Sequence, residues 1–123
     1  MSRRLTRFVV TSATGAALLC AAPAVAGTSL HKTVHIGDNY FTPHALKVKK
    51  GTTITWKWPG ADVAGDVHDV KLKSGPKGAK KFHSQPASSD YSFKRKLTVP
   101  GTYRIICTLH ESMTMKIVVR KPA

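Results

Sequence analysis

The sequence has 123 residues and carries 20 Lys and Arg against 6 Asp and Glu, which gives a formal net charge of +14. This length allows one compact domain behind a targeting segment and excludes a chain of two full domains. No stretch after residue 26 is long and apolar enough to cross a bilayer, so a multi-span membrane protein is excluded as well.

The first residues, 1–26, are predicted to be a secretory signal. A basic start is followed by a small apolar middle and by the triplet AVA at 24–26, which is typical of a cleavage site. The opening "MSRR" also resembles a twin-arginine signal, so the export route stays open. We therefore predict an exported protein, periplasmic or extracellular, whose mature domain is 27–123 and no longer contains Cys20.

The first half of this domain alternates apolar and polar residues with the period of β-strands. In "TTITWKWPG", Ile54, Trp56 and Trp58 fall on one face, while Thr55 and Lys57 fall on the other. The segments "TVHIGDNYF" and "TPHALKVKKG" show a similar pattern, and the first of them contains a Gly-Asp-Asn turn. Such strands are typical of sheets that bury one face against a second sheet.

The second half begins with the stretch 71–90, which is rich in Lys, Gly, Pro and Ser and is predicted to be mostly irregular surface. After it, "YSFKRKLTVPGTYRIIC" contains two alternating segments joined by a Pro-Gly turn, and "KIVVR" follows near the end of the chain. No window keeps a helical period for three turns. The fold prediction is all-β: a Greek-key β-sandwich of about 7–8 strands.

One cysteine, Cys107, remains after the signal is removed, so the mature domain has no internal disulfide. An exposed free thiol is easily oxidised outside the cell, whereas a metal-bound thiolate is protected. Cys107, His110 and Met113 follow one another within "CTLHESM", and His68 in "GDVHDV" lies upstream. One thiolate, two imidazoles and a weak axial thioether are the ligands of mononuclear copper electron-transfer sites.

The segment "GTYRIICTLHESM" resembles the end of the blue-copper cupredoxins, the plastocyanin, pseudoazurin and amicyanin group. Gly-Thr-Tyr at 101–103 and the Cys-x-x-His of Cys107 and His110 match this family in order and spacing. Upstream, "YFTPHALKVKKGTTITWKW" matches its Phe-x-Pro, Lys-Gly and Thr-x-Trp pattern, so the resemblance covers nearly all of 27–123. It implies a cupredoxin fold, with one copper ion held by His68, Cys107, His110 and a methionine, and with His110 near the surface as the exit for the electron.

Two methionines compete for the axial position. By the resemblance, Met113 gives the short loop of amicyanin, while Met115 gives the His-to-Met spacing of plastocyanin and pseudoazurin. The Met-x-Gly-x-Val frame of the family places Met113 on the ligand. Met115 shares the inward parity of Ile117 and Val119, which a core position explains. We therefore predict Met113 as the ligand and keep Met115 as the alternative.

Two departures from the family pattern lie beside these ligands. The family often has a proline between the cysteine and the histidine, where this chain has Leu109, and an asparagine after the first histidine, where it has Asp69. By the resemblance, the side chain of Asp69 would tie the His68 loop to Thr108 and add negative charge near the metal. The reduction potential and the rigidity of the loops are the properties that these departures affect.

The remaining histidines are interpreted as solvated surface groups: His31, His35, His44 and His83. His31 and His35 would share one strand face, so a weak second metal site stays open there. Zinc is the competing metal for the main site, but structural zinc sites close with four Cys or His ligands, and this chain offers a thioether. Copper, one mononuclear Cu(I)/Cu(II), is therefore the predicted cofactor.

The predicted function is a non-enzymatic, monomeric carrier of single electrons between redox partners, and the alternative is a copper-binding buffer or delivery protein. An enzyme would need an open coordination position or a second copper centre. The positive charge predicts a redox partner with an acidic docking surface, steered by lysines of 71–81 and 94–96, and allows contact with an anionic membrane or wall polymer. Nucleic acid is not a predicted partner, since no recognition-helix pattern or aromatic RNA-binding motif is present.

Overall fold

A computed structural model describes Gly15 and residues 30–122 of the chain. The predicted signal over 1–26, apart from Gly15, lies outside the described residues. The described part contains these elements: β1 His31–Gly37, β2 Tyr40–Thr42, β3 Ala45–Lys49, β4 Thr52–Lys57, the 3₁₀ turn η1 Ala61–Val63, β5 Lys71–Ser74, β6 Ser92–Leu97, β7 Gly101–Cys107 and β8 His110–Arg120. No helix in this part is long and apolar enough to span a membrane.

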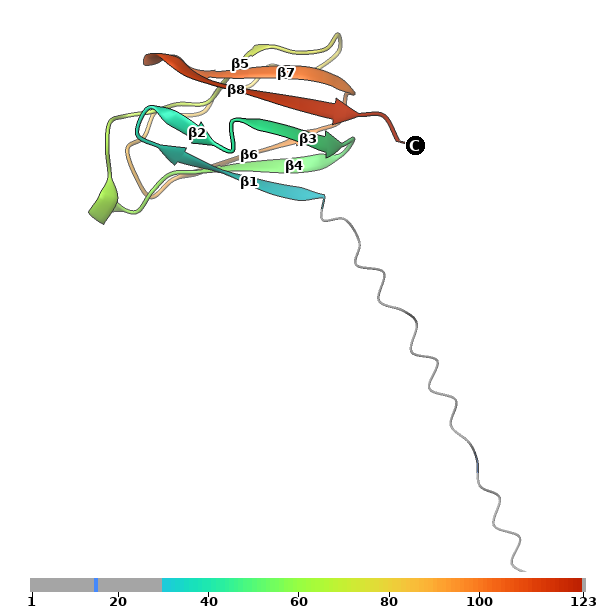
Figure 1. The fold of residues 1–123 in the computed structure, drawn as a ribbon, viewed down its shortest axis with the longest axis horizontal. Helices are drawn as coiled ribbons and strands as arrows, with labels where there is room; N and C mark the ends of the chain where they lie inside the picture. The colour runs from blue at the N-terminus through green and yellow to red at the C-terminus, as the bar shows by residue number, and fades with distance from the viewer. Residues whose placement is uncertain (1–14, 16–29, 123) are drawn as a thin grey trace, which may run out of the picture.

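The strands form two four-stranded sheets, which lie one above the other in Figure 1. The strand order is β2-β1-β4-β6 in one sheet and β3-β8-β7-β5 in the other. β1 and β4 run parallel, as do β3 and β8, while the other neighbouring strands are antiparallel. Many neighbours are not consecutive in the chain, which is typical of Greek-key sandwiches. The prediction of an all-β sandwich is confirmed.

Apolar side chains fill the space between the sheets because each strand presents alternate residues inward. The inward positions of β8 are all buried: Met113, Met115, Ile117 and Val119. An aromatic cluster lies at the centre, where the ring of Trp56 is 5.7 Å from that of Phe82 and 5.9 Å from that of Phe93. Trp56 is fully buried, so the Trp-rich strand β4 is a core strand as predicted.

The segment 71–90 is more ordered than its composition indicated. Residues Lys71–Ser74 form β5, which pairs antiparallel with β7, and Phe82 belongs to the buried aromatic cluster. Residues 75–90 contain no helix or strand, as predicted, while Lys71–Ser74 and the buried Phe82 depart from the prediction of irregular surface. β5 has a single buried residue, Leu72, so its alternation is too short to recognise, and the order comes from pairing with β7.

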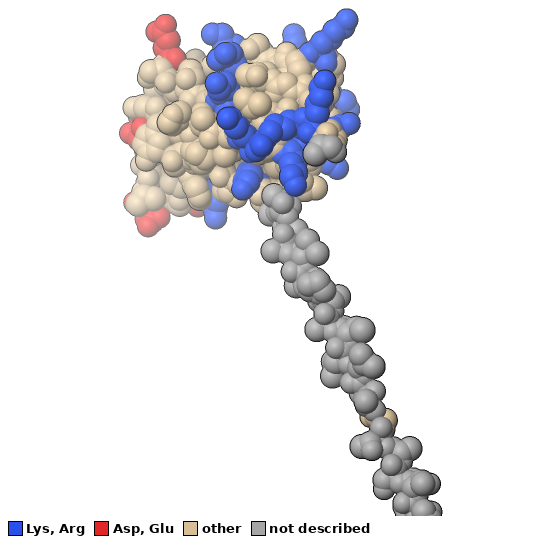
Figure 2. Space-filling view, turned by 45° about the vertical axis from the view of Figure 1, so that its right-hand side comes forward, with Lys and Arg blue, Asp and Glu red and all other residues tan. Residues whose placement is uncertain are grey.

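The two ends of the sandwich differ in their turns and in their charge. The β7–β8 turn, the β1–β2 turn and η1 lie at one end, here called the site end (Figure 1). The β3–β4 turn and the C-terminal end of β8 lie at the other, here called the basic end because Lys and Arg crowd that side of Figure 2. The six carboxylates lie in loops or strand ends of the site end: Asp38, Asp62, Asp66, Asp69, Asp90 and Glu111.

Candidate metal centre

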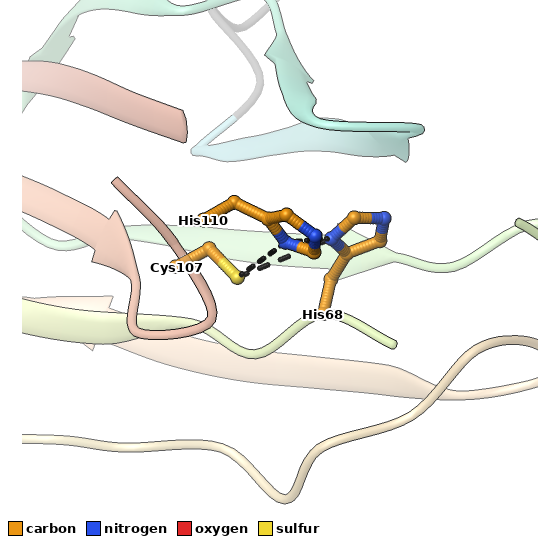
Figure 3. A group of neighbouring side chains, drawn as sticks. All are labelled: His68, Cys107 and His110. Carbon is orange, nitrogen blue, oxygen red and sulfur yellow. Dashed lines mark hydrogen bonds between the residues drawn. The ribbon is translucent and has the colours of Figure 1, made fainter. Parts of the chain in front are cut away.

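Three side chains with metal-ligating atoms meet at the site end. Cys107 ends β7 and is paired with His110, which opens β8, while His68 comes from the β4–β5 connection. Nδ1 of His68 lies 3.1 Å from Nδ1 of His110, and Sγ of Cys107 lies 3.9 Å and 3.6 Å from these two nitrogens, respectively. Figure 3 shows the three side chains turned toward one another. Within the described residues, they form the one group of three or more His, Cys or acidic side chains spaced to hold a metal ion.

The spacing of these three atoms fits a metal ion lying among them. The point equidistant from the two nitrogens and the sulfur lies about 2.1 Å from each, the length of a metal–nitrogen bond to a first-row divalent ion. Soft thiolate and imidazole ligands together favour copper or zinc among such ions. The three donor atoms therefore lie at distances that would allow them to hold one metal ion without any change of side-chain conformation.

Carboxylates lie at the far nitrogens of both imidazoles. Nε2 of His68 is 3.3 Å from Oδ1 of Asp38, and Nε2 of His110 is 3.7 Å from Oδ2 of Asp66. A carboxylate at Nε2 favours the tautomer that leaves Nδ1 unprotonated and free to bind a metal. The backbone N–H of Asp66 donates to Oδ1 of Asp38 at 3.1 Å, and this bond is the main cause that lowers the pKa of Asp38.

The two histidines differ in their access to solvent. His68 is 2% exposed, while the side chain of His110 keeps 24% of its surface exposed. The indole N–H of Trp58 donates to the backbone carbonyls of His68, at 3.3 Å, and Ala87, at 2.8 Å, so the buried histidine is held by the core. His110 therefore offers the shortest route from this group to the surface, which agrees with the expectation from the resemblance.

Asp69 joins three segments next to the site. Its carboxylate accepts from the backbone N–H of Thr108 at 2.6 Å, from the hydroxyl of Thr108 at 2.5 Å, and from Nε2–H of His83 at 2.8 Å. The predicted contact between Asp69 and Thr108 is thus present. Burial acts to raise the pKa of Asp69, but the bonds from His83 and Thr108 outweigh it and hold this pKa below its usual value.

Both methionines of β8 point into the core, but they lie at different distances from the site end. Met115 lies opposite Ile105, and its sulfur accepts a hydrogen bond from the indole N–H of Trp56 at 3.3 Å. Met113 is fully buried and lies one inward position, about 7 Å, nearer the turn that carries Cys107. The core contact explains Met115, and the position in the strand favours Met113 as the thioether of the site.

Sequence comparison identifies the group of proteins in which this arrangement occurs. The family model of copper binding proteins of the plastocyanin/azurin family matches residues 28–120. The chain belongs to this family. The predicted cupredoxin resemblance and the copper cofactor are thereby confirmed, and His68, Cys107 and His110 form the group that fits the metal in this plastocyanin/azurin domain.

Individual relatives support the same assignment. The chain is 33% identical over 86 residues to amicyanin-alpha from Methylorubrum extorquens, which covers 70% of this chain and 69% of that protein. It is 30% identical to plastocyanin from Dryopteris crassirhizoma, over 66% of this chain and 86% of that one. A solved structure of a reduced amicyanin variant superposes with a TM-score of 0.62 at 27% identity, covering 73% of this chain and 82% of the other. Amicyanin and plastocyanin are not enzymes, so the prediction of a non-enzymatic copper protein is confirmed.

Three contacts of this cupredoxin site had no signal in the sequence. Asp38 and Asp66 lie 30 and 44 residues from the histidines that they face, and no spacing rule connects them. His83 is exposed at the surface, as interpreted, and in addition donates to Asp69. The sequence contained one hint, namely Asp69 directly after the predicted ligand His68. A carboxylate in this position is expected to accept hydrogen bonds from further residues.

The other spare histidines are not brought together with metal-ligating neighbours. Nε2 of His31 lies 2.8 Å from the hydroxyl of Thr55 on the adjacent strand. His35 and His44 are exposed and belong to no metal-type group within residues 30–122. The alternative of a second metal site on the face shared by His31 and His35 thus gains no support from the structure.

The lysines expected to steer an acidic partner are not gathered around the site of this cupredoxin. Lys80, Lys81 and Lys96 line a hollow beside Tyr103, next to the β6–β7 turn at the basic end. Exposed acidic and apolar residues lie next to the two histidines in the sequence. Asp66 and Val67 precede His68, and Leu109 and Glu111 flank His110. The positive net charge of the chain is therefore not the charge of the side chains next to the two histidines.

Proposed function

We propose that the chain is an exported type 1 copper protein that carries single electrons between redox partners. The convergence of Nδ1 of His68, Nδ1 of His110 and Sγ of Cys107, at 3.1 to 3.9 Å from one another, carries this proposal. Bound copper would supply the one-electron couple. His68, Cys107 and His110 would be its strong ligands, and Met113 its weak axial ligand.

The side chains around the site would support electron transfer in three ways. Trp58 and Asp69 fix the loops of His68 and Thr108, so the ligand positions would change little between the two oxidation states. Met113 and Cys107 are buried, so this side of the site would be closed to water. His110, with its partly exposed ring, would bring the electron to the surface.

Storage or delivery of copper is the second candidate function, because it would use the same ligands. The hydrogen bonds that brace the ligand loops favour a carrier, since a delivery protein has to open its site to release the metal. Protein-film voltammetry separates the two. A reversible one-electron wave that survives repeated cycling, without loss of copper to a chelator, supports the carrier, and rapid transfer of copper to that chelator would overturn it.

The two methionines are expected to respond differently to substitution. Met113→Leu would raise the reduction potential, because loss of a thioether donor disfavours Cu(II) relative to Cu(I). Met115→Leu would leave the potential nearly unchanged but lower the free energy of unfolding by about 1–2 kcal/mol, since the indole N–H of Trp56 loses its acceptor. Voltammetry and urea unfolding of the pair measure both effects. The opposite pattern would assign the axial position to Met115.

The partner is a redox protein, and the local charges indicate the surface that it presents. An interface centred on His110 would include exposed Leu109 and Val67 together with Asp66 and Glu111. We therefore propose an apolar docking patch with a basic rim on the partner, in place of the acidic surface expected from net charge. Attraction between such rims is screened by salt over about 8 Å at 0.15 M ionic strength.

A small, positively charged oxidant tests whether the surface around His110 is negative. Oxidation by tris(phenanthroline)cobalt(III), a tripositive complex, is expected to slow with rising salt, although the whole protein is positive. Asp62→Asn combined with Glu111→Gln would slow it about tenfold at low ionic strength. The control, Lys96→Gln with Arg120→Gln, removes two charges from the basic end and would change this rate less than about twofold. Faster oxidation with added salt would restore the expectation of an acidic partner.

Export and a monomeric state complete the proposal. Export is supported by the basic start and the apolar middle of residues 1–26. Expression in a bacterial host followed by N-terminal sequencing of the periplasmic fraction tests this step. A first residue of Gly27 supports cleavage after Ala26, whereas recovery of the intact chain in the cytoplasm would contradict it.

A further inference from the structure

The basic end of the sandwich carries positive charge that the electron-carrier function does not use. Nine Lys and Arg side chains line three neighbouring hollows there, and no Asp or Glu lines any of them. Arg120 contributes to two of these hollows, Lys121 to one, and Lys96 to the third. Lys50 is exposed in the adjacent β3–β4 turn, where its backbone N–H bonds to the carbonyl of Arg120.

This surface is too far from the copper site to act on the same partner. β8 runs from His110 to Arg120, which places the two ends about 33 Å apart along the strand. The Debye length at 0.15 M ionic strength is about 8 Å, so each end acts as a separate electrostatic surface. The Asp and Glu side chains lie at the site end, where three of them face histidines.

The shape and composition of the basic end favour a broad anionic surface as its binding partner over a nucleic-acid strand. Its charges come from strands and turns of both sheets: the start of β1, the ends of β3 and β8, and β6. Among residues 30–122, the large exposed apolar residue at this end is Leu30, with 51% exposure, so the described part offers no exposed aromatic platform there on which nucleic-acid bases would stack. Basic side chains surrounding an exposed aliphatic group suit the headgroup region of a lipid bilayer.

The chain direction agrees with this assignment. β1 begins at His31 and enters the sheet from the basic end, as Figure 1 shows. β8 begins with His110 at the opposite, site end. A domain that binds a bilayer with its basic end therefore has His110 directed away from the lipid.

We propose that the basic end is a binding surface for anionic phospholipid membranes, which holds the domain with its copper site facing the aqueous phase. The surface contains no residue of the copper site. Membrane binding should therefore persist in the Cys107→Ser variant, so failure of this proposal and failure of the electron-carrier proposal are distinguishable.

Vesicle sedimentation of the chain beginning at Gly27 tests the proposal without the N-terminal segment. We expect binding to vesicles of equal parts phosphatidylglycerol and phosphatidylcholine at 50 mM salt, with loss of binding at 500 mM and none to phosphatidylcholine alone. A variant with Lys50, Lys96, Arg120 and Lys121 replaced by Gln should bind more than about a hundredfold more weakly.

A matched variant separates a defined surface from attraction by net charge. Replacing Lys57, Lys71, Lys73 and Lys116 with Gln removes the same charge from exposed positions outside the three hollows, and should weaken binding less than about threefold. Equal losses in the two variants, or equal binding to neutral vesicles, would overturn the proposal. Binding to soluble teichoic acid without binding to anionic vesicles would overturn it in favour of a wall polymer. Both variants should keep the wild-type melting temperature, which excludes misfolding as the cause.

Discussion

Replacing Cys107 with serine is expected to abolish the intense absorption near ~600 nm that a copper–thiolate bond gives to the oxidised protein. Serine removes the thiolate donor, and its hydroxyl stays protonated at neutral pH. Loss of a hydrogen-bonding partner around a metal ligand already costs about 10–100-fold in metal affinity, so loss of the ligand itself should cost more than a hundredfold. Visible spectroscopy and a competitive Cu(II) titration measure the two effects.

Two further variants make this result specific to the proposed site. His110→Gly should weaken copper binding but allow the band to return when imidazole is added, because the partly exposed position of His110 is open to an external ligand. His31→Ala, on the exposed face of β1, should leave the spectrum unchanged. A full-intensity band in the Cys107→Ser protein would mean that another group binds the copper, and would refute the ligand set.

Replacing Asp69 with alanine is expected to lower the free energy of unfolding by about 2–3 kcal/mol, because a buried carboxylate that accepts three hydrogen bonds is removed. The loops that carry His68 and Thr108 lose their connection, so copper should also dissociate faster. Asp69→Asn, which restores the residue often found in the family, should recover most of the stability. Urea unfolding of the metal-free protein and a chelator-driven release assay provide the two readouts.

The same carboxylate predicts a pH dependence of known sign. The folded-state pKa of Asp69 is held below its unfolded value of about 3.9, so its contribution to stability is present above that pH. The contribution is lost as the pH falls through the folded-state pKa. The stability difference between the metal-free wild type and Asp69→Ala should therefore shrink as the pH falls below about 4. The exposed Asp62→Asn serves as control, and a difference that grew in acid would contradict this account.

Local features of the chain were predictable because their causes are local. The two-residue alternation of β4, β7 and β8 reports which face of a strand is buried, and it placed Ile117 and Val119 correctly. Cys107 and His110 could be grouped because one tight turn joins them. By contrast, β5 has only one inward residue, Leu72, and became visible only through its pairing with β7.

By itself, the sequence determined the sandwich, the copper chemistry and the ligand candidates, since strand periodicity and the Cys-x-x-His spacing are properties of contiguous residues. Only the tertiary structure decided which loops share an end of the sandwich. That placement put Asp38 and Asp66 against the imidazoles and His83 against Asp69. It also separated a net positive chain into an acidic copper end and a basic opposite end, because charges interact through space over distances that the order of residues does not record.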